Sequence, residues 1–162
     1  MLSQAVDDIS GVLADVRRLV HDLRPPALDE LGLPGALSQQ AAKLSSVWLP
    51  IQITVSDGLP ALPAAVEVAA YRIASEAMTN VVRHSGATQC VVALAHEPQW
   101  LVVEVVDNGI GIAATRTAGV GMLSLRERAD ELGGQCSVEC PPGGGTLVHA
   151  RLPLPGQDGA HA

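Results

Sequence analysis

The stretch from Glu76 to His84 places polar residues where a buried helix face is expected. It lies in a helical pattern from Ala64 to Ser85, whose apolar positions recur every three or four residues: Val66, Ala69, Ala70, Ile73, Ala77 and Val81. At about 100° per residue, Asn80 and His84 fall inside this stripe and Glu76 on its edge. An unpaired buried amide or imidazole costs about 1–3 kcal/mol, so these groups need partners. A bound polar ligand is one candidate, and neighbouring backbone is the other.

A carboxylate, Asp107, continues the apolar row of a predicted strand. In the segment from Trp100 to Val106, one face carries Leu101, Val103 and Val105, and the period of two adds Asp107 to it. A buried carboxylate needs a donor, because leaving it unpaired costs several kcal/mol. The glycines of the following Asn108-Gly109-Ile110-Gly111 allow backbone to approach a ligand closely or to adopt positive φ.

A glycine-rich stretch, Gly119-Val120-Gly121, opens another predicted helix, whose apolar stripe is Met122, Leu125, Ala129 and Leu132. Such a helix start offers free N–H groups and a positive dipole end, which suit a phosphate, although the pattern alone is weak evidence. Before it, residues 112–118 are small and polar and are predicted to form a mobile loop. Further on, Thr146 shares a strand face with Val148, Ala150 and Leu152, so a hydroxyl also lines an apolar surface.

The elements that must position these residues alternate between helix and strand. They are a helix through Leu33 to Leu44, a strand from Trp48 to Val55, the long helix ended by Gly86 as a left-handed cap, strands at Gln89 to Ala95 and Trp100 to Val106, the helix after Gly119, and strands at Gln135 to Cys140 and Thr146 to Leu152. This order predicts an α/β two-layer sandwich, with one mixed β-sheet covered by helices on a single face.

The N-terminal segment has a heptad pattern. Its apolar positions step by four and three residues: Leu2, Val6, Ile9, Leu13, Val16, Val20 and Leu23. One helix cannot bury such a seam, so we expect it to pair with a second chain or with a helix outside this sequence; packing along its own domain is the alternative. Arg24-Pro25-Pro26 ends the helix. We therefore divide the chain into a helix at 1–26, a domain at 27–155 and a disordered tail at 156–162.

Composition limits the classes of function. The net charge of −7 argues against nucleic acid as a broad surface partner. No apolar run reaches the roughly 18 residues that span a bilayer, and the N-terminus lacks an export signal, which predicts a soluble, cytoplasmic piece. Cys90, Cys136 and Cys140 have neither CxxC nor zinc-site spacing, which indicates structural or incidental thiols.

Taken in order, these motifs resemble the ATP-binding domain of bacterial sensor histidine kinases, in the GHKL superfamily that also includes the ATPase domains of gyrase, Hsp90 and MutL. The motifs that resemble its N box, its two glycine boxes and its last motif are Glu76 to His84, Asp107 to Gly111, Gly119 to Met122, and Gly144-Gly145-Thr146. The stretch from Leu23 to Leu33 is similar to the linker of the subfamily paired with LuxR/NarL-type response regulators. The resemblance covers Val6 to Leu154 and implies the Bergerat fold.

The resemblance also implies roles for individual residues. Asp107 would accept a hydrogen bond from the adenine amine, supported by Thr146, and Asn80 would ligate the Mg²⁺ that bridges the ATP phosphates. Glu76 would be the catalytic carboxylate: in the ATPases this position activates water, and in kinases it polarises the acceptor imidazole or arranges the metal. The remaining nucleotide-binding positions would be Arg83 and His84 near the phosphates, the backbone of Gly119, Val120, Gly121 and Met122 around the β and γ groups, and Gly109 and Gly111 beside Asp107.

The implied function is transfer of the γ-phosphoryl group to a histidine on a dimerisation domain, and then to a response regulator, in a homodimeric kinase that is either soluble or membrane-anchored. We expect the acceptor histidine to lie outside this chain, because His21-Asp22 has the acceptor dipeptide but sits at the end of the helix, immediately before the prolines. The chain alone is then expected to bind ATP without phosphorylating itself. Two alternatives are a serine kinase of the anti-sigma-factor type and a non-catalytic module that binds nucleotide or dimerises. With no Phe and a short lid, the chain departs from many histidine kinases, though not from the subfamily above.

Overall fold

The computed structural model of the chain describes residues 2–111 and 120–156. Helices and strands follow one another as α1 (Leu2–Asp22), α2 (Pro26–Leu44), β1 (Ile51–Val55), α3 (Ala64–Asn80), the π-helical segment η1 (Val81–Ser85), β2 (Cys90–Glu97), β3 (Trp100–Asp107), α4 (Val120–Asp130), β4 (Gln135–Glu139) and β5 (Thr146–Pro153). The predicted loop at 112–118 lies outside the described residues, as do Gly119 and most of the predicted tail.

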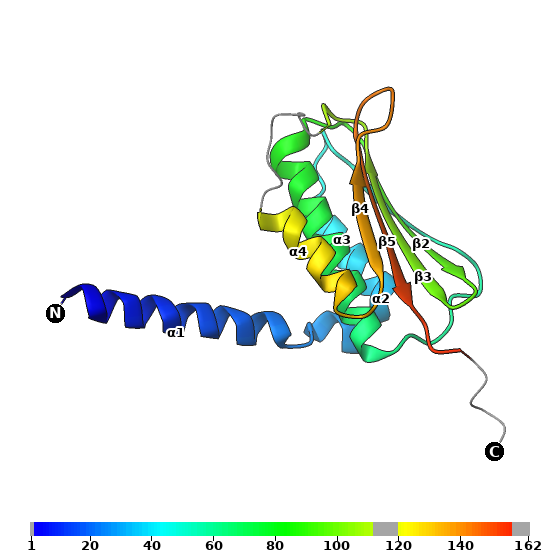
Figure 1. The fold of residues 1–162 in the computed structure, drawn as a ribbon. Coiled ribbons are helices and arrows are strands. Elements are labelled where there is room, and N and C mark those ends of the chain that lie inside the picture. Colours follow the sequence, from blue (N-terminus) through cyan, green and yellow to red (C-terminus); the bar gives the residue numbers. More distant parts are fainter. Residues whose placement is uncertain (1, 112–119, 157–162) are drawn as a thin grey trace, which may run out of the picture.

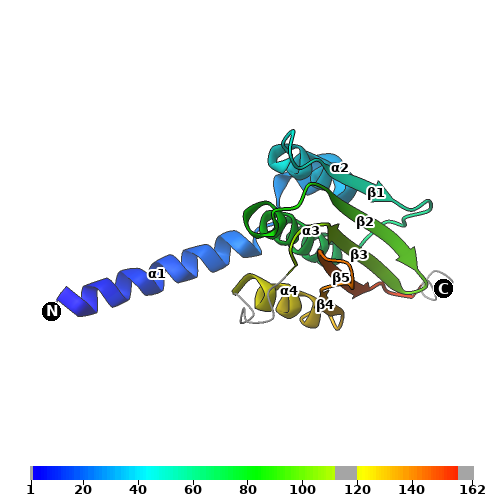
Figure 2. The same cartoon turned by 90° about the horizontal axis from the view of Figure 1, so that it is seen from above.

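The strands form one five-stranded sheet in the order β1-β2-β3-β5-β4. Only β1 and β2 pair in parallel, and the other pairs are antiparallel, so the sheet is mixed. Helices α2, α3 and α4 cover one face of this sheet, and no helix of the described residues lies on the other face (Figures 1 and 2). The predicted two-layer α/β sandwich is therefore confirmed.

The core lies between the helices and the covered face of the sheet. On α3, Ile73 and Met78 are fully buried, and they belong to the same core cluster as strand residues that are equally buried, such as Leu101 and Val103 on β3. As predicted, the inward positions of β3 alternate along the strand and end at Asp107, which is only 6% exposed. The aliphatic core thus leads directly to a buried carboxylate at the end of β3.

Two elements start more than two residues from their predicted starts. Helix α2 begins at Pro26, but Gly32 (φ 71°) is non-helical and kinks it, so the helix predicted from Leu33 forms its second part and the first part was not predicted. Pro34 falls in the first turn after the kink, where a missing N–H is tolerated. Strand β1 begins at Ile51 instead of Trp48. The preceding residues form a tight turn, in which Ser46 N–H donates to Leu49 O (3.1 Å) and Leu49 N–H donates to Ser46 O (3.2 Å).

Helix α1 extends away from the sandwich (Figure 1). Among its heptad positions, Val6, Ile9 and Leu13 are 60%, 60% and 51% exposed. Pairing through this seam stays a prediction, since the structure holds a single chain. No helix among the described residues is long and apolar enough to cross a membrane.

Candidate functional site

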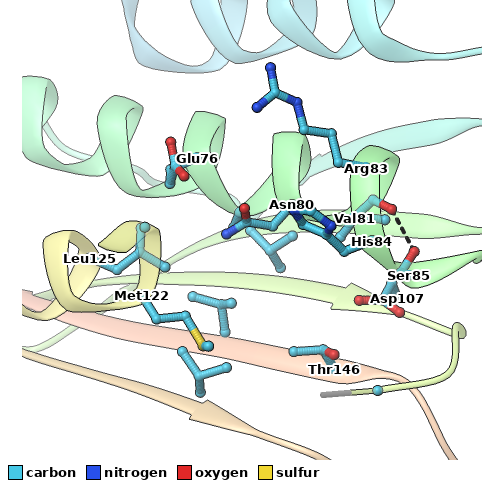
Figure 3. A pocket seen from close by; sticks show the side chains of 16 residues that line it. Glu76, Asn80, Val81, Arg83, His84, Ser85, Asp107, Met122, Leu125 and Thr146 are labelled. Carbon is cyan, nitrogen blue, oxygen red and sulfur yellow. Dashed lines mark hydrogen bonds between the residues drawn. The ribbon is translucent and has the colours of Figure 1, made fainter. Parts of the chain in front are cut away.

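A pocket of about 510 Å³ opens between the helices and the covered face of the sheet. Figure 3 shows it bounded by α3 and η1 on one side, α4 on another, and the strands below. Most of the sequence-predicted site residues line it: Glu76, Asn80, Arg83, His84, Asp107, Gly111, Gly121, Met122 and Thr146. Residues that are 70 positions apart in the sequence, such as Glu76 and Thr146, therefore meet in one cavity.

Asp107 occupies the floor of the pocket, at the end of β3. Its Oδ1 accepts a hydrogen bond from Gly109 N–H at 2.7 Å, and the described residues offer no donor to Oδ2. Asp107 is the register partner of Thr146 on β5 and of Cys90 on β2. Burial, with a further contribution from the Asp107 charge, raises the pKa of Cys90 to about 12, so this thiol stays neutral beside the carboxylate. Within residues 2–111 and 120–156, the buried charge thus has one protein donor, and Oδ2 has none.

Glu76 and Asn80 lie one turn apart on α3, half-buried, and both line the pocket. Neither side chain makes a hydrogen bond to another residue in the described part of the chain, and the same is true of His84. Among the described residues, neighbouring backbone therefore does not satisfy Asn80, which argues against the second of the two alternatives considered above and favours a bound ligand. A half-buried carboxamide and a carboxylate are left facing a space large enough for a ligand.

The expectation that His84 lies inside the buried stripe is wrong, because His84 is exposed. The cause is η1: after Asn80 the backbone changes to the wider i to i+5 hydrogen bonding of a π-helix, so the 100° step no longer holds. His84 therefore lies at the rim of the pocket, and the next residue, Ser85, is buried in its place at 6% exposed. Arg83 also lies at the rim and points away from the strands (Figure 3).

Gly121 brings the start of α4 against the polar residues of α3. A Cβ at this position would lie 2.5 Å from Glu76 Oε1 and 3.6 Å from Asn80 Nδ2, so any side chain would fill the space beside them. Val120 is the first residue of α4, and Gly119 lies outside the described residues. The helix start therefore faces Glu76 and Asn80 with bare backbone, where N–H groups can reach a ligand.

The two glycines after Asp107 have different positions. Gly111 (φ 76°) lines the pocket, whereas Gly109 lies behind Asp107 and does not. A Cβ on Gly109 would collide with Ser85 O and would lie 2.8 Å from Ser85 Cβ. Gly109 therefore acts on the carboxylate through its N–H, with no contact to the cavity.

Several lining residues were not predicted. The inner-face positions Val105 and Val148 share their strand faces with Asp107 and Thr146, so the period of two could have identified them. Ser85 gave no such signal, because its burial depends on the π-helical segment. The other unpredicted lining residues are apolar: Ala77, Val81, Leu125 and Val138.

A comparison with known protein families matches residues 65–156 to the family described as histidine kinase-, DNA gyrase B-, and HSP90-like ATPase. The match begins in α3 and ends beyond β5, so it contains every element that lines the pocket. The chain belongs to this family. Within this ATPase family, the resemblance to the ATP-binding domain of sensor histidine kinases is supported by the relatives described next.

The chain is 32% identical, over 153 residues, to the sensor histidine kinase MctS of Rhizobium johnstonii. The aligned region covers 91% of this chain and 33% of that protein. Among solved structures, it resembles the ATP binding domain of PrrB from Mycobacterium tuberculosis (TM-score 0.56, 23% identity, 76% of this chain and 92% of that one). It also resembles full-length ShkA in complex with AMPPNP (TM-score 0.63, 22% identity, 75% of this chain and 30% of that one). At 22% to 23% identity, these two structural matches show a shared fold and no more. The chain spans 33% to 39% of the length of the curated relatives it matches.

Proposed function

We propose that this ATPase-family chain is the ATP-binding catalytic domain of a two-component sensor histidine kinase. The observation that carries the proposal is that Asp107 and Asn80, from β3 and α3, face one pocket, and that the Asp107 Oδ2 and the Asn80 carboxamide have no hydrogen-bond partner in the part of the chain that the structure describes. The Asp107 carboxylate suits the amine edge of a purine, and the Asn80 carboxamide suits a hard cation. The pocket volume of about 510 Å³ leaves room for a nucleotide between them.

At the floor of the pocket, Asp107 would recognise adenine. Oδ1 is engaged by Gly109 N–H, which leaves Oδ2 as the acceptor for the exocyclic amine. Thr146, its partner across β3 and β5, would support the same edge with its hydroxyl. The apolar inner-face residues Val105 and Val148 would contact the face of the base.

At the other end, Asn80 Oδ1 would hold Mg²⁺ together with the ATP phosphates. The donor set fits this ion, because Mg²⁺ in phosphate sites takes only one or two protein oxygens and keeps phosphate and water oxygens for the rest. When bound, the ion would neutralise phosphate charge. Gly121 and the neighbouring amides of Gly119, Val120 and Met122 would hold the β and γ groups, with Arg83 and His84 at the rim and Gly111 lining the pocket beside Asp107.

Glu76 would be the catalytic carboxylate. It lies one helical turn from Asn80 and beside Gly121, where the γ-phosphoryl group would sit. From there it could orient the acceptor imidazole and accept its proton as the phosphoryl group transfers. Phosphoryl transfer depends mainly on alignment and charge neutralisation, which this arrangement supplies.

In the whole protein, we propose that α1 is the C-terminal part of a dimerisation helix and that the acceptor histidine lies on the same dimerisation domain. The phosphohistidine formed there would then pass its phosphoryl group to a response regulator. The linker after Leu23 favours a regulator of the LuxR/NarL type. The exposed seam on α1 supports a homodimer. A domain that depends on ATP would lie in the cytoplasm.

The test is a calorimetric titration of the chain with ATP in the presence and absence of Mg²⁺, followed by incubation with γ-labelled ATP and the upstream dimerisation helix. We expect Mg²⁺-dependent binding, and label on histidine only when that helix is present. Acid-stable label on serine would instead favour the serine kinase. Absence of nucleotide binding would refute the proposal.

A further inference from the structure

We propose that Ser85 and Asn108 are positioning residues for Asp107. Together they clamp the connection between η1 and β2 onto the turn after β3, and so fix the direction of the carboxylate and its preference for an amino group over a carbonyl oxygen. The inference deepens the proposed function, on which it rests for the identity of the ligand.

Ser85 forms the first half of the clamp. Its hydroxyl donates to Val81 O at 2.6 Å and accepts from Ala87 N–H at 3.0 Å, while its own carbonyl oxygen accepts from Ile110 N–H at 2.9 Å. A hydroxyl has a single proton, and here that proton is committed to Val81. Ser85 lines the pocket but cannot donate to a ligand, so its contribution is to hold the end of η1 against the turn.

Asn108 forms the second half. Its Oδ1 accepts from both Thr88 N–H (2.9 Å) and Gln89 N–H (3.0 Å), and its Nδ2 donates to Thr88 Oγ1 at 2.9 Å. Its backbone N–H also donates to Gln89 O at 3.3 Å. The side chain does not line the pocket, so these bonds serve the connection between the two segments.

Gly109 lies between the two halves and transmits their effect. Its N–H donates to Asp107 Oδ1 at 2.7 Å, and the place of its missing side chain is filled by Ser85. Because the residues on both sides of Gly109 are bonded to the clamped connection, this N–H has little freedom to move. It holds Oδ1, and Oδ2 is left to face the ligand.

This geometry determines which purine is accepted. An amino group can donate to Oδ2, whereas a carbonyl oxygen at the same place would set two acceptors against each other. If the clamp loosens, the carboxylate can rotate and its discrimination declines. The ratio of ATP to GTP affinity is the appropriate measure, because the two nucleotides have the same charge and share every phosphate contact.

The experiment compares Asn108→Ala and Ser85→Ala with the wild type by calorimetry with Mg-ATP and Mg-GTP. We expect each variant to lower the ATP to GTP affinity ratio by roughly tenfold, corresponding to a hydrogen bond or two. Matched controls are Gln52→Ala on β1 and Ser56→Ala at the far end of the sheet, where the hydroxyl accepts from His96 N–H; both should keep the ratio. Asn108→Asp keeps the acceptor for the two N–H groups, so it should keep the ratio as well.

A second measurement needs no nucleotide. Amide hydrogen exchange at Gly109 and Ile110, followed by NMR, should accelerate in both alanine variants and stay slow in the controls and in Asn108→Asp. If either alanine variant unfolds, Ser85→Thr and Asn108→Asp decide: each should retain both slow exchange and the wild-type ratio. An unchanged ratio with unchanged exchange in the alanine variants would overturn the inference. A wild-type chain that binds neither nucleotide would refute the proposed function, and the exchange rates would still test the clamp.

Discussion

Replacement of Asp107 by asparagine isolates the contact proposed to recognise the purine. The side chain is almost isosteric and 6% exposed, and its Oδ1 is held by Gly109 N–H at 2.7 Å. The amide oxygen can keep that bond, but Nδ2 then replaces Oδ2 and directs a donor at the donor of the adenine amine. The alternative rotamer places Nδ2 against Gly109 N–H. Either orientation loses one hydrogen bond to a charged acceptor.

The loss can be estimated from this geometry. A hydrogen bond to a charged group contributes about 1.5–3 kcal/mol, which corresponds to roughly 10- to 150-fold in affinity. The fold should persist, since the bond to Gly109 can be kept and a buried charge is removed. We expect the free energy of unfolding to fall by no more than about 1 kcal/mol.

Calorimetric titration with Mg-ATP measures the effect, and denaturant unfolding checks the fold. Glu104→Gln is the matched control. Glu104 lies on the same strand with its carboxylate on the opposite face, bonded to His149 Nδ1 at 2.9 Å, so its replacement should leave ATP affinity unchanged. Wild-type affinity in a folded Asp107→Asn variant would refute the assignment of this carboxylate to the purine.

The remaining predictions concern the metal, the phosphate end, the buried thiol and the seam. Asn80→Asp should shift the Mg²⁺ dependence of nucleotide binding, and identical binding curves across Mg²⁺ concentrations would contradict it. Gly121→Val should weaken ATP binding by more than tenfold, because its Cβ would already lie 2.5 Å from Glu76 Oε1; Mg-ATP calorimetry measures this, with unfolding as the check. Burial raises the pKa of Cys90 from 9.0 to about 12. The part of the free energy of unfolding that comes from keeping this thiol neutral should therefore be complete below pH 9 and be lost as the pH rises towards 12. A Cys90→Ala variant should lose that alkaline slope in denaturant titrations. Ile9→Lys should weaken any self-association seen by sedimentation without lowering ATP affinity, since Ile9 is 60% exposed and far from the pocket.

Periodicity was sufficient for most of the fold. Alternation along β3 correctly placed Asp107 at the end of a buried row, and the spacing on α3 placed Glu76 and Asn80 on one side of a helix. Both patterns are local, and the residues that obey them are packed against the core.

Features that depend on backbone geometry could not be predicted. The π-helical segment turned His84 to the rim and buried Ser85, and nothing in the residue types from Val81 to Ser85 indicates where i to i+4 bonding ends. The role of Gly109 was likewise invisible, because it depends on contact with Ser85, which is 24 positions earlier in the chain. Such contacts are fixed by the tertiary structure.

The most direct measurement is a crystal structure of the chain with Mg²⁺ and a non-hydrolysable ATP analogue. The account predicts the purine amine within hydrogen-bonding distance of Asp107 Oδ2, the metal beside Asn80 Oδ1, and the phosphates at the start of α4. A nucleotide bound outside this pocket, or bound within it with the purine away from Asp107, would contradict the account.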